Sequence, residues 1–298
     1  MKKYYHLFIV VSFVFVAFAL AKIDYLSLPR LHSPVLLGLS MLLLCLGFVA
    51  EARVWKVTCG KFGCPISLKD SFSSIGLSVF GKYIPGKIWL IMGRAGYLNQ
   101  HHSYSVKKLA YIALVSQLLI IWMGLGIGLI AVWNLSFVPE PGKWGLVALW
   151  LISSLIMIHP FVHKKAAAFV RQITRGRVEL PVLNFRDAVA LIPTYLVRWI
   201  LFSASFYCAM QALSEVSLPW YAATIFPLAG TIGLFVFFLP GGIGVREGII
   251  VFFLVQMGLD TASSVGLSVA SRLWIVTGEI ATFLVGFSLR RKPSQPLG

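Results

Sequence analysis

The feature that most limits the fold is a series of long apolar stretches separated by short polar ones. Apolar runs occupy 34–53, 109–133, 188–213 and 265–289, and each is about as long as a helix that crosses a bilayer. Only 12% of the residues are charged, whereas roughly 25% is usual in soluble domains. The sequence therefore predicts an all-α, polytopic membrane helix bundle. It excludes an ordinary soluble enzyme, a disordered chain and a secreted disulfide scaffold.

Further apolar segments bring the expected number of transmembrane elements to about eight. A run at 7–21 follows Met1-Lys2-Lys3 and predicts an uncleaved first helix rather than a signal peptide. Another run at 144–160 predicts a spanning helix, and 164–174 is a candidate helix at the membrane surface. We expect residues 1–292 to form a single integral membrane domain and 293–298 to form a short polar cytoplasmic tail.

The net charge of +16 has a topological explanation. Seventeen of the 26 Lys and Arg residues fall in loops expected on one side, three in loops on the other side, and six within membrane segments. Basic loops face the cytoplasm in membrane proteins. We therefore expect a multi-pass protein of the plasma (inner) membrane with both termini cytoplasmic. The basic residues would contact anionic lipid headgroups, and no nucleic acid partner is expected.

Two of the apolar segments are broken in the middle. The first, 72–92, is interrupted by Gly81-Lys82-Tyr83-Ile84-Pro85-Gly86-Lys87, and the second, 221–239, ends at Pro240-Gly241-Gly242. Proline and lysine do not suit the centre of a spanning helix. Irregular backbone at membrane depth is tolerated only where protein buries it or a wet cavity adjoins it. The sequence thus predicts two broken or re-entrant segments.

The two broken segments resemble each other. Each has an Ile-Gly-Leu-x-Val-Phe run, at 75–80 and 232–237, followed by Pro-Gly and then by Arg94 or Arg246. The spacing from Phe to Pro differs by two residues, and chance similarity between common membrane residues is the alternative. Because the expected topology makes the segments enter from opposite sides, we predict an inverted repeat with a substrate site at its interface.

The second break carries the sharpest motif, Pro240-Gly241-Gly242-Ile243-Gly244-Val245-Arg246-Glu247. Glycines allow backbone amides to face an anion, a helix start adds its positive end, and arginine offers a fork for phosphate. The alternative is a tight turn in which Arg246 pairs with Glu247 or another acid. The two interpretations are compatible, since a rigid turn can present a site.

Other charged residues are expected within the membrane. The cations are Lys82, Lys87, Arg94, Arg198 and Arg272, and the acids are Glu247 and Glu279. An arginine at a helix centre costs roughly 2.5–3.5 kcal/mol, so each should face a cavity or a partner. We expect Arg272 to pair with Glu279, seven residues along the same helix. The excess positive charge would suit an anionic headgroup, although structural pairing or snorkelling can explain each arginine singly.

No metal site, cofactor or catalytic constellation is expected. The four cysteines and six histidines show no metal-ligand spacing, and no Ser/His/Asp order or nucleotide-binding loop is visible. We therefore do not expect an enzyme.

With these motifs the chain resembles the family of the lysylphosphatidylglycerol synthase transmembrane region, also called flippase-like integral membrane proteins. The resemblance implies about eight transmembrane elements with re-entrant segments. It also implies transfer of aminoacylated phosphatidylglycerol between leaflets, or a link to polyprenyl-phosphate sugars or hopanoids. Since the sequence shows no soluble aminoacyl-transferase domain, we expect a stand-alone member that does not make the lysyl-lipid itself. The positions that match the family motifs are Pro85, Gly86, Arg94, Pro240, Gly241, Gly242, Gly244, Arg246, Glu247 and Arg272.

The leading hypothesis is a flippase or transporter for an anionic lipid, either an aminoacyl-phospholipid or a polyprenyl-phosphate-linked sugar. A non-transporting partner of a glycosyltransferase or lipid synthase is the alternative, and a membrane-embedded lipid-modifying enzyme is a weaker one. The candidate substrate-binding residues are Lys82, Pro85, Gly86, Lys87, Arg94, Arg198, Gly241, Gly242, Gly244, Arg246, Glu247, Arg272 and Glu279.

Overall fold

The computed structural model describes residues 29–84, 88–158, 184–236 and 240–291, with a few isolated positions between 159 and 183. The described residues form helices joined by short loops, and no strand occurs among them. The expected first helix at 7–21, the polar tail at 293–298 and most of the surface helix at 164–174 lie outside these residues.

Four long helices have the length and composition to cross a membrane: α2 (Pro34–Lys61), α5 (Val106–Trp133), α8 (Phe185–Leu213) and α11 (Thr261–Leu289). A helix of 28 residues is about 42 Å long, which exceeds the roughly 30 Å of a hydrocarbon core. The predicted polytopic helix bundle is confirmed. α2 continues past the predicted end at residue 53 because its last turns bury Trp55 and Cys59.

Local sequence explains where these helices begin. The Ser105 hydroxyl accepts a hydrogen bond from the Lys108 N–H at the start of α5, and the Asp260 carboxylate accepts one from the Ser263 N–H at the start of α11. The helix α6 (Glu140–Ile158) begins four residues before the predicted boundary. Pro141 suits its first turn, because proline lacks only an N–H that the first turn leaves unpaired.

Both broken segments are present as pairs of short helices. The first consists of α3 (Leu68–Ser78), the 3-10 turn η1 (Val79–Tyr83) and α4 (Ile88–His101). The second begins with the 3-10 turn η2 (Trp220–Thr224) and consists of α9 (Ile225–Phe235), the 3-10 turn η3 (Pro240–Gly242) and α10 (Val245–Gln256). A long helix precedes and follows each pair. The same order of elements therefore occurs twice, from α2 to α5 and from α8 to α11.

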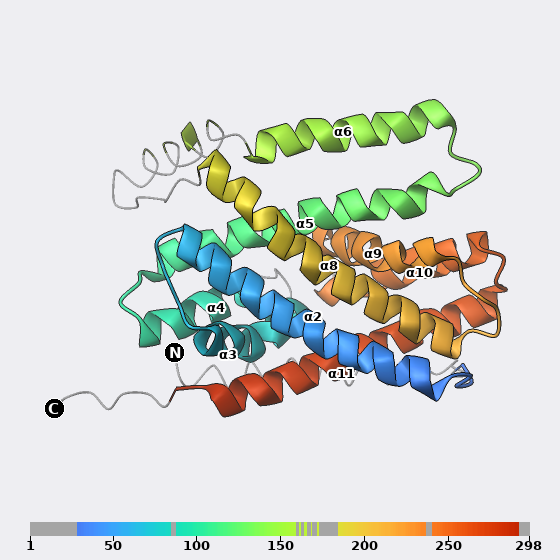
Figure 1. Ribbon diagram of the computed structural model, residues 1–298, viewed down its shortest axis with the longest axis horizontal. Coiled ribbons are helices and arrows are strands. Elements are labelled where there is room, and N and C mark those ends of the chain that lie inside the picture. Colours follow the sequence, from blue (N-terminus) through green and yellow to red (C-terminus); the bar gives the residue numbers. More distant parts are fainter. Residues whose placement is uncertain are drawn as a thin grey trace.

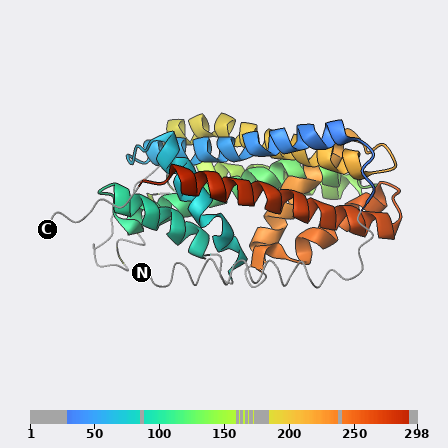
Figure 2. The same cartoon turned by 90° about the horizontal axis from the view of Figure 1, so that it is seen from below.

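The two halves pack in a reciprocal way. α2 packs along α8, α3 packs against α11, α9 packs against α5, and η1 meets η3. Glycines permit the close contacts. A Cβ on Gly76 in α3 would lie 2.5 Å from the Thr282 carbonyl oxygen in α11, and one on Gly128 in α5 would lie 2.7 Å from Leu228 in α9. In Figure 2, α2 and α8 lie on one face of the bundle, and α4 and α10 project from the opposite face.

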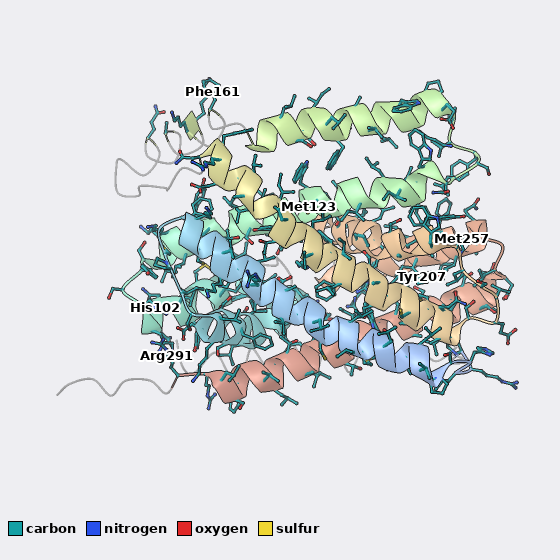
Figure 3. All side chains as sticks on the ribbon, in the orientation of Figure 1. His102, Met123, Phe161, Tyr207, Met257 and Arg291 are labelled. Atoms are coloured by element: carbon teal, nitrogen blue, oxygen red, sulfur yellow. The ribbon has the colours of Figure 1, made fainter. Side chains whose placement is uncertain are left out.

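The bundle has two ends (Figure 1), and polar contacts join the helices at each of them. At one, the Lys61 end, Lys61 pairs with Asp187, and Asp70 pairs with both His102 and Arg291. At the other, the Met257 end, the Ser33 N–H donates to the Ala212 carbonyl oxygen. His102 and Arg291 lie together at the Lys61 end, and Tyr207 and Met257 lie in the opposite half (Figure 3). The α3–α4 hairpin thus starts and finishes at the Lys61 end, and the α9–α10 hairpin opens toward the other.

Candidate functional site

The two breaks meet inside the bundle at Gly241. This residue has a φ of 60°, and a Cβ placed there would lie 2.8 Å from both Arg272 Nη2 and the Tyr83 ring. Only glycine adopts such backbone without strain. The glycine therefore lets η3 approach η1 and α11 closely enough for their polar groups to touch.

Around Gly241 lies a set of polar residues that we call the central cluster, of which Tyr83, Arg246, Arg272 and Glu279 are buried and Lys82 and Glu247 are half-buried. Glu279 is 0% exposed and pairs with Lys82. The Tyr83 hydroxyl donates to Glu279 Oε2 at 2.8 Å. First-break residues thus supply both described partners of the Glu279 carboxylate.

Arg272 is held by the second break. Its Nη1 donates to the Gly241 carbonyl oxygen at 3.2 Å and lies 3.4 Å from Glu247 Oε1. Its guanidinium also stacks 5.1 Å from the centre of the Tyr83 ring. The expected pairing of Arg272 with Glu279 is therefore wrong. Seven residues separate them by about 10 Å along the helix axis, and each finds a nearer partner across a break.

The glycine motif serves mainly to build the turn. The Gly244 N–H donates to Glu247 Oε2 at 2.7 Å, which caps the start of α10. Gly242 has a φ of 69°, and a Cβ there would lie 2.8 Å from the Gly233 carbonyl oxygen. The Gly244 amide is consequently occupied by a carboxylate of the protein itself, and Gly242 is required for close packing.

Arg246 differs from the other cations of the central cluster. It is only 7% exposed, and its Nε and Nη2 atoms are buried without a hydrogen-bond partner. Its guanidinium lies 5.0 Å from the centre of the Phe226 ring, which holds it by a cation–π contact. Among the ion pairs of the described residues, Glu247 pairs with Arg272 rather than with Arg246. Arg246 therefore keeps free donors inside the bundle.

A second buried set, the Glu51 cluster, consists of Glu51, Arg94 and Arg198. Arg94 Nη2 lies 3.0 Å from Glu51 Oε1, and Arg198 Nε pairs with Glu51 Oε2. The three residues come from α2, α4 and α8. Both arginines were predicted for the site, but Glu51 was not, because the predicted end of its helix at residue 53 placed it beside a polar loop. Its position in an apolar run, two residues before Arg53, was the available signal.

The candidate residues from the sequence thus fall into two groups. The central cluster brings Lys82, Gly241, Arg246, Glu247, Arg272 and Glu279 together, with Gly242 and Gly244 in the adjoining turn. Arg94 and Arg198 instead contact Glu51. Tyr83, which the sequence analysis did not select, joins the central cluster. Pro85, Gly86 and Lys87 lie outside the described residues.

The central cluster has the chemistry to hold an oxyanion. A guanidinium with two free N–H directions can form parallel hydrogen bonds to a phosphate or carboxylate. Arg246 offers such donors where the surrounding protein excludes most of the water, and Arg272 adds positive charge beside it. Low polarity strengthens these interactions relative to water.

Comparison with known proteins identifies one family. Residues 6–280 match the family described as the lysylphosphatidylglycerol synthase TM region. No curated protein matches the chain. The matched region contains both broken segments and all residues of the two clusters. Because the match spans most of the 298 residues, the chain belongs to the family of the lysylphosphatidylglycerol synthase transmembrane region.

Proposed function

We propose that the protein is a flippase that moves a lipid with an anionic phosphate group between the leaflets of the plasma (inner) membrane. Its cargo would be an aminoacyl-phospholipid or a polyprenyl-phosphate-linked sugar, and it would act as a transporter rather than as an enzyme. The observation that carries the proposal is the buried Arg246 guanidinium with two unpaired nitrogen atoms, located where the two broken segments meet.

The energetics favour a ligand at Arg246. A buried donor without an acceptor costs about 1–3 kcal/mol, and more when it is charged. An arriving phosphate would supply the missing acceptors, while the apolar chains of the lipid stay in the bilayer. Phe226 fixes the guanidinium without occupying its N–H groups, so the donors are already oriented.

The repeated order of elements supports movement of the cargo across the membrane. We interpret the two halves as an inverted repeat, because their hairpins open toward opposite ends and their breaks meet at the centre. In transporters of this kind, the site lies at the repeat interface and motion of one repeat against the other exposes it to each side. The Lys61 end carries most of the basic loop residues, and we assign it to the cytoplasm.

A reconstituted transport assay tests the proposal. Wild type and Arg246→Gln are placed in liposomes containing fluorescent aminoacyl-phosphatidylglycerol or, in a parallel series, a fluorescent polyprenyl-phosphate sugar, and dithionite quenching measures how fast each lipid changes leaflet. We expect Arg246→Gln to slow translocation at least about tenfold, since a charge-assisted hydrogen bond contributes about 1.5–3 kcal/mol. Arg246→Lys should be intermediate, because lysine keeps the charge but lacks the fork.

Arg290→Gln is the matched control. Arg290 also stacks on a phenylalanine, Phe287, but it is exposed at the Lys61 end. Its replacement should leave the rate nearly unchanged. If wild-type protein translocates neither lipid faster than protein-free liposomes do, the transport proposal is refuted. Co-purification of a glycosyltransferase or lipid synthase in that case would favour the partner-protein hypothesis.

A further inference from the structure

The Glu51 cluster has more hydrogen-bond donors than its carboxylate can accept. Each oxygen of Glu51 accepts from one arginine, which leaves Arg94 Nε and Arg198 Nη1 buried without a partner. Arg94 and Glu51 are each 7% exposed. Two guanidinium groups face one carboxylate, so the cluster carries an excess positive charge. Buried unsatisfied donors are rare in folded proteins and call for an explanation.

A phosphate would fit these donors better than a carboxylate does. Its oxygens are arranged tetrahedrally, so they can accept from both guanidinium groups at once, and arginine binds phosphate through paired hydrogen bonds. We propose that Arg94 and Arg198 form a second anion-binding site for a phosphate group, and that Glu51 is the internal ligand which occupies this site in the present conformation. A lipid phosphate arriving at the site would then displace the Glu51 carboxylate.

The Arg198 guanidinium is held in place independently of the Glu51 carboxylate. The Arg198 guanidinium lies 4.4 Å from the centre of the Trp199 ring and 4.9 Å from that of Phe202. Glu51 and Arg198 stand on α2 and α8, which pack along each other over much of their length. The arginine is thus oriented for an anion even when Glu51 moves away.

Arg94 connects this second site to the central cluster. It lies on α4, and Lys82, which pairs with Glu279, lies in η1 of the same hairpin. A shift of the hairpin that separates Lys82 from Glu279 would therefore also move Arg94 relative to Glu51. A headgroup released at one cluster could be received at the other. The inference rests on the proposed function only in taking a lipid as the source of the phosphate.

The test measures phosphate binding without transport. The Arg246→Gln background removes the unpaired guanidinium of the central cluster, so the change in phosphate binding that Glu51→Gln adds to this background reports on the Glu51 cluster. Arg246→Gln and the double variant Arg246→Gln/Glu51→Gln are purified in detergent. Their melting temperatures are measured at a series of inorganic phosphate concentrations, with chloride added to keep the ionic strength constant. We expect Glu51→Gln to lower the half-saturating phosphate concentration about tenfold, which corresponds to about 1.4 kcal/mol.

Three further variants make the result specific. Adding Arg198→Gln to the double variant should abolish the gain in phosphate affinity. Glu140→Gln, which removes an exposed acid paired with Lys143, should give no gain. Glu51→Asp retains the charge on a shorter side chain, so it should give a smaller gain in phosphate affinity. It replaces Glu51→Gln in the test if that variant does not fold. Unchanged phosphate affinity in the Glu51 variants that fold, or a gain that survives Arg198→Gln, would overturn the proposal.

Native mass spectrometry separates the two sources of phosphate. Each protein is released from micelles containing phosphatidylglycerol, and the lipids that stay bound are counted. One extra phosphatidylglycerol on the Glu51→Gln proteins supports a lipid headgroup at the site, whereas a phosphate effect without an extra lipid supports a site for free phosphate. Because transport is not measured, this proposal can fail while Arg246 remains essential for flipping, and the reverse also holds.

Discussion

The two broken segments have the same architecture but offer different groups to the centre of the protein. The first break supplies side chains, since Lys82 and Tyr83 both contact Glu279 of α11. The second supplies a backbone group as well as side chains, since the Gly241 carbonyl accepts from Arg272 of α11 and Glu247 Oε1 lies 3.4 Å from Nη1 of the same arginine. One helix, α11, thus presents an acid to one break and a base to the other.

This difference shows which change should damage each break. A break that works through side chains fails when a charge or hydroxyl is removed. A break that works through backbone fails when a Cβ is added, because its positive φ values and close contacts leave no room for one.

The largest loss of stability should come from removing the charge of the first break. Lys82→Met leaves the fully buried Glu279 carboxylate without its counter-charge, which should cost about 3–5 kcal/mol of unfolding free energy. Unfolding in mixed detergent micelles measures it. Lys143→Met, which breaks a pair with the exposed Glu140, is the control and should cost less than about 1 kcal/mol. Equal losses would show that Glu279 is not held as described.

Removing one hydroxyl from the same break should have the next largest effect. Tyr83→Phe deletes the 2.8 Å hydrogen bond to Glu279 Oε2. A bond to a charged group contributes about 1.5–3 kcal/mol, and the same unfolding assay would detect that loss. In a Glu279→Gln background the effect of Tyr83→Phe should shrink, because the acceptor is no longer charged. Full additivity of the two changes would contradict the contact.

Adding a methyl group should damage the second break. In Gly241→Ala the Cβ would lie 2.8 Å from the Tyr83 ring and would strain a φ of 60°. We expect a loss of about 1–3 kcal/mol. Gly248→Ala is the matched control, since a Cβ there meets nothing within 4 Å in helix α10. A Gly241→Ala protein as stable as the control would remove the distinction between the two breaks.

The smallest effect concerns the caps of the two helices that follow the breaks. Ser105→Ala at α5 should cost about 1 kcal/mol at any pH. At α11, hydrogen bonds from Ser263 lower the pKa of the Asp260 carboxyl below its ordinary value. Its stabilising effect is therefore present above the ordinary pKa and is lost as the pH falls through the lowered one.

The melting temperature of each variant at pH 7 and near pH 3 checks this contrast. The difference between wild type and Asp260→Ala should narrow at the acidic pH. The difference between wild type and Ser105→Ala should stay the same. A pH-dependent Ser105→Ala difference would point to a cause other than the cap.

Much of the candidate site could be predicted because proline, glycine and intramembrane charge are local signals. Gly241 and Arg246 were identified from a short motif, and Lys82 from its position in an apolar run. Glu51 could not be predicted as a site residue, because its contacts come from α4 and α8, which follow it in the chain. The Arg272–Glu279 pairing failed for a similar reason, since spacing along one helix says nothing of a competing partner from another.

The membrane-spanning helices and the positions of the two breaks could be read from the sequence alone. The length of an apolar segment and the effect of proline and glycine on its backbone are local properties. They determine whether that segment can cross a bilayer as a helix, whatever the rest of the chain does. Which charges meet depends on how the helices pack. Lys82 and Glu279 are 197 residues apart, and Arg198 and Glu51 are 147 apart. Such pairs form where packing brings distant helices together, and in a medium of low polarity that packing determines which arginine is left with free donors.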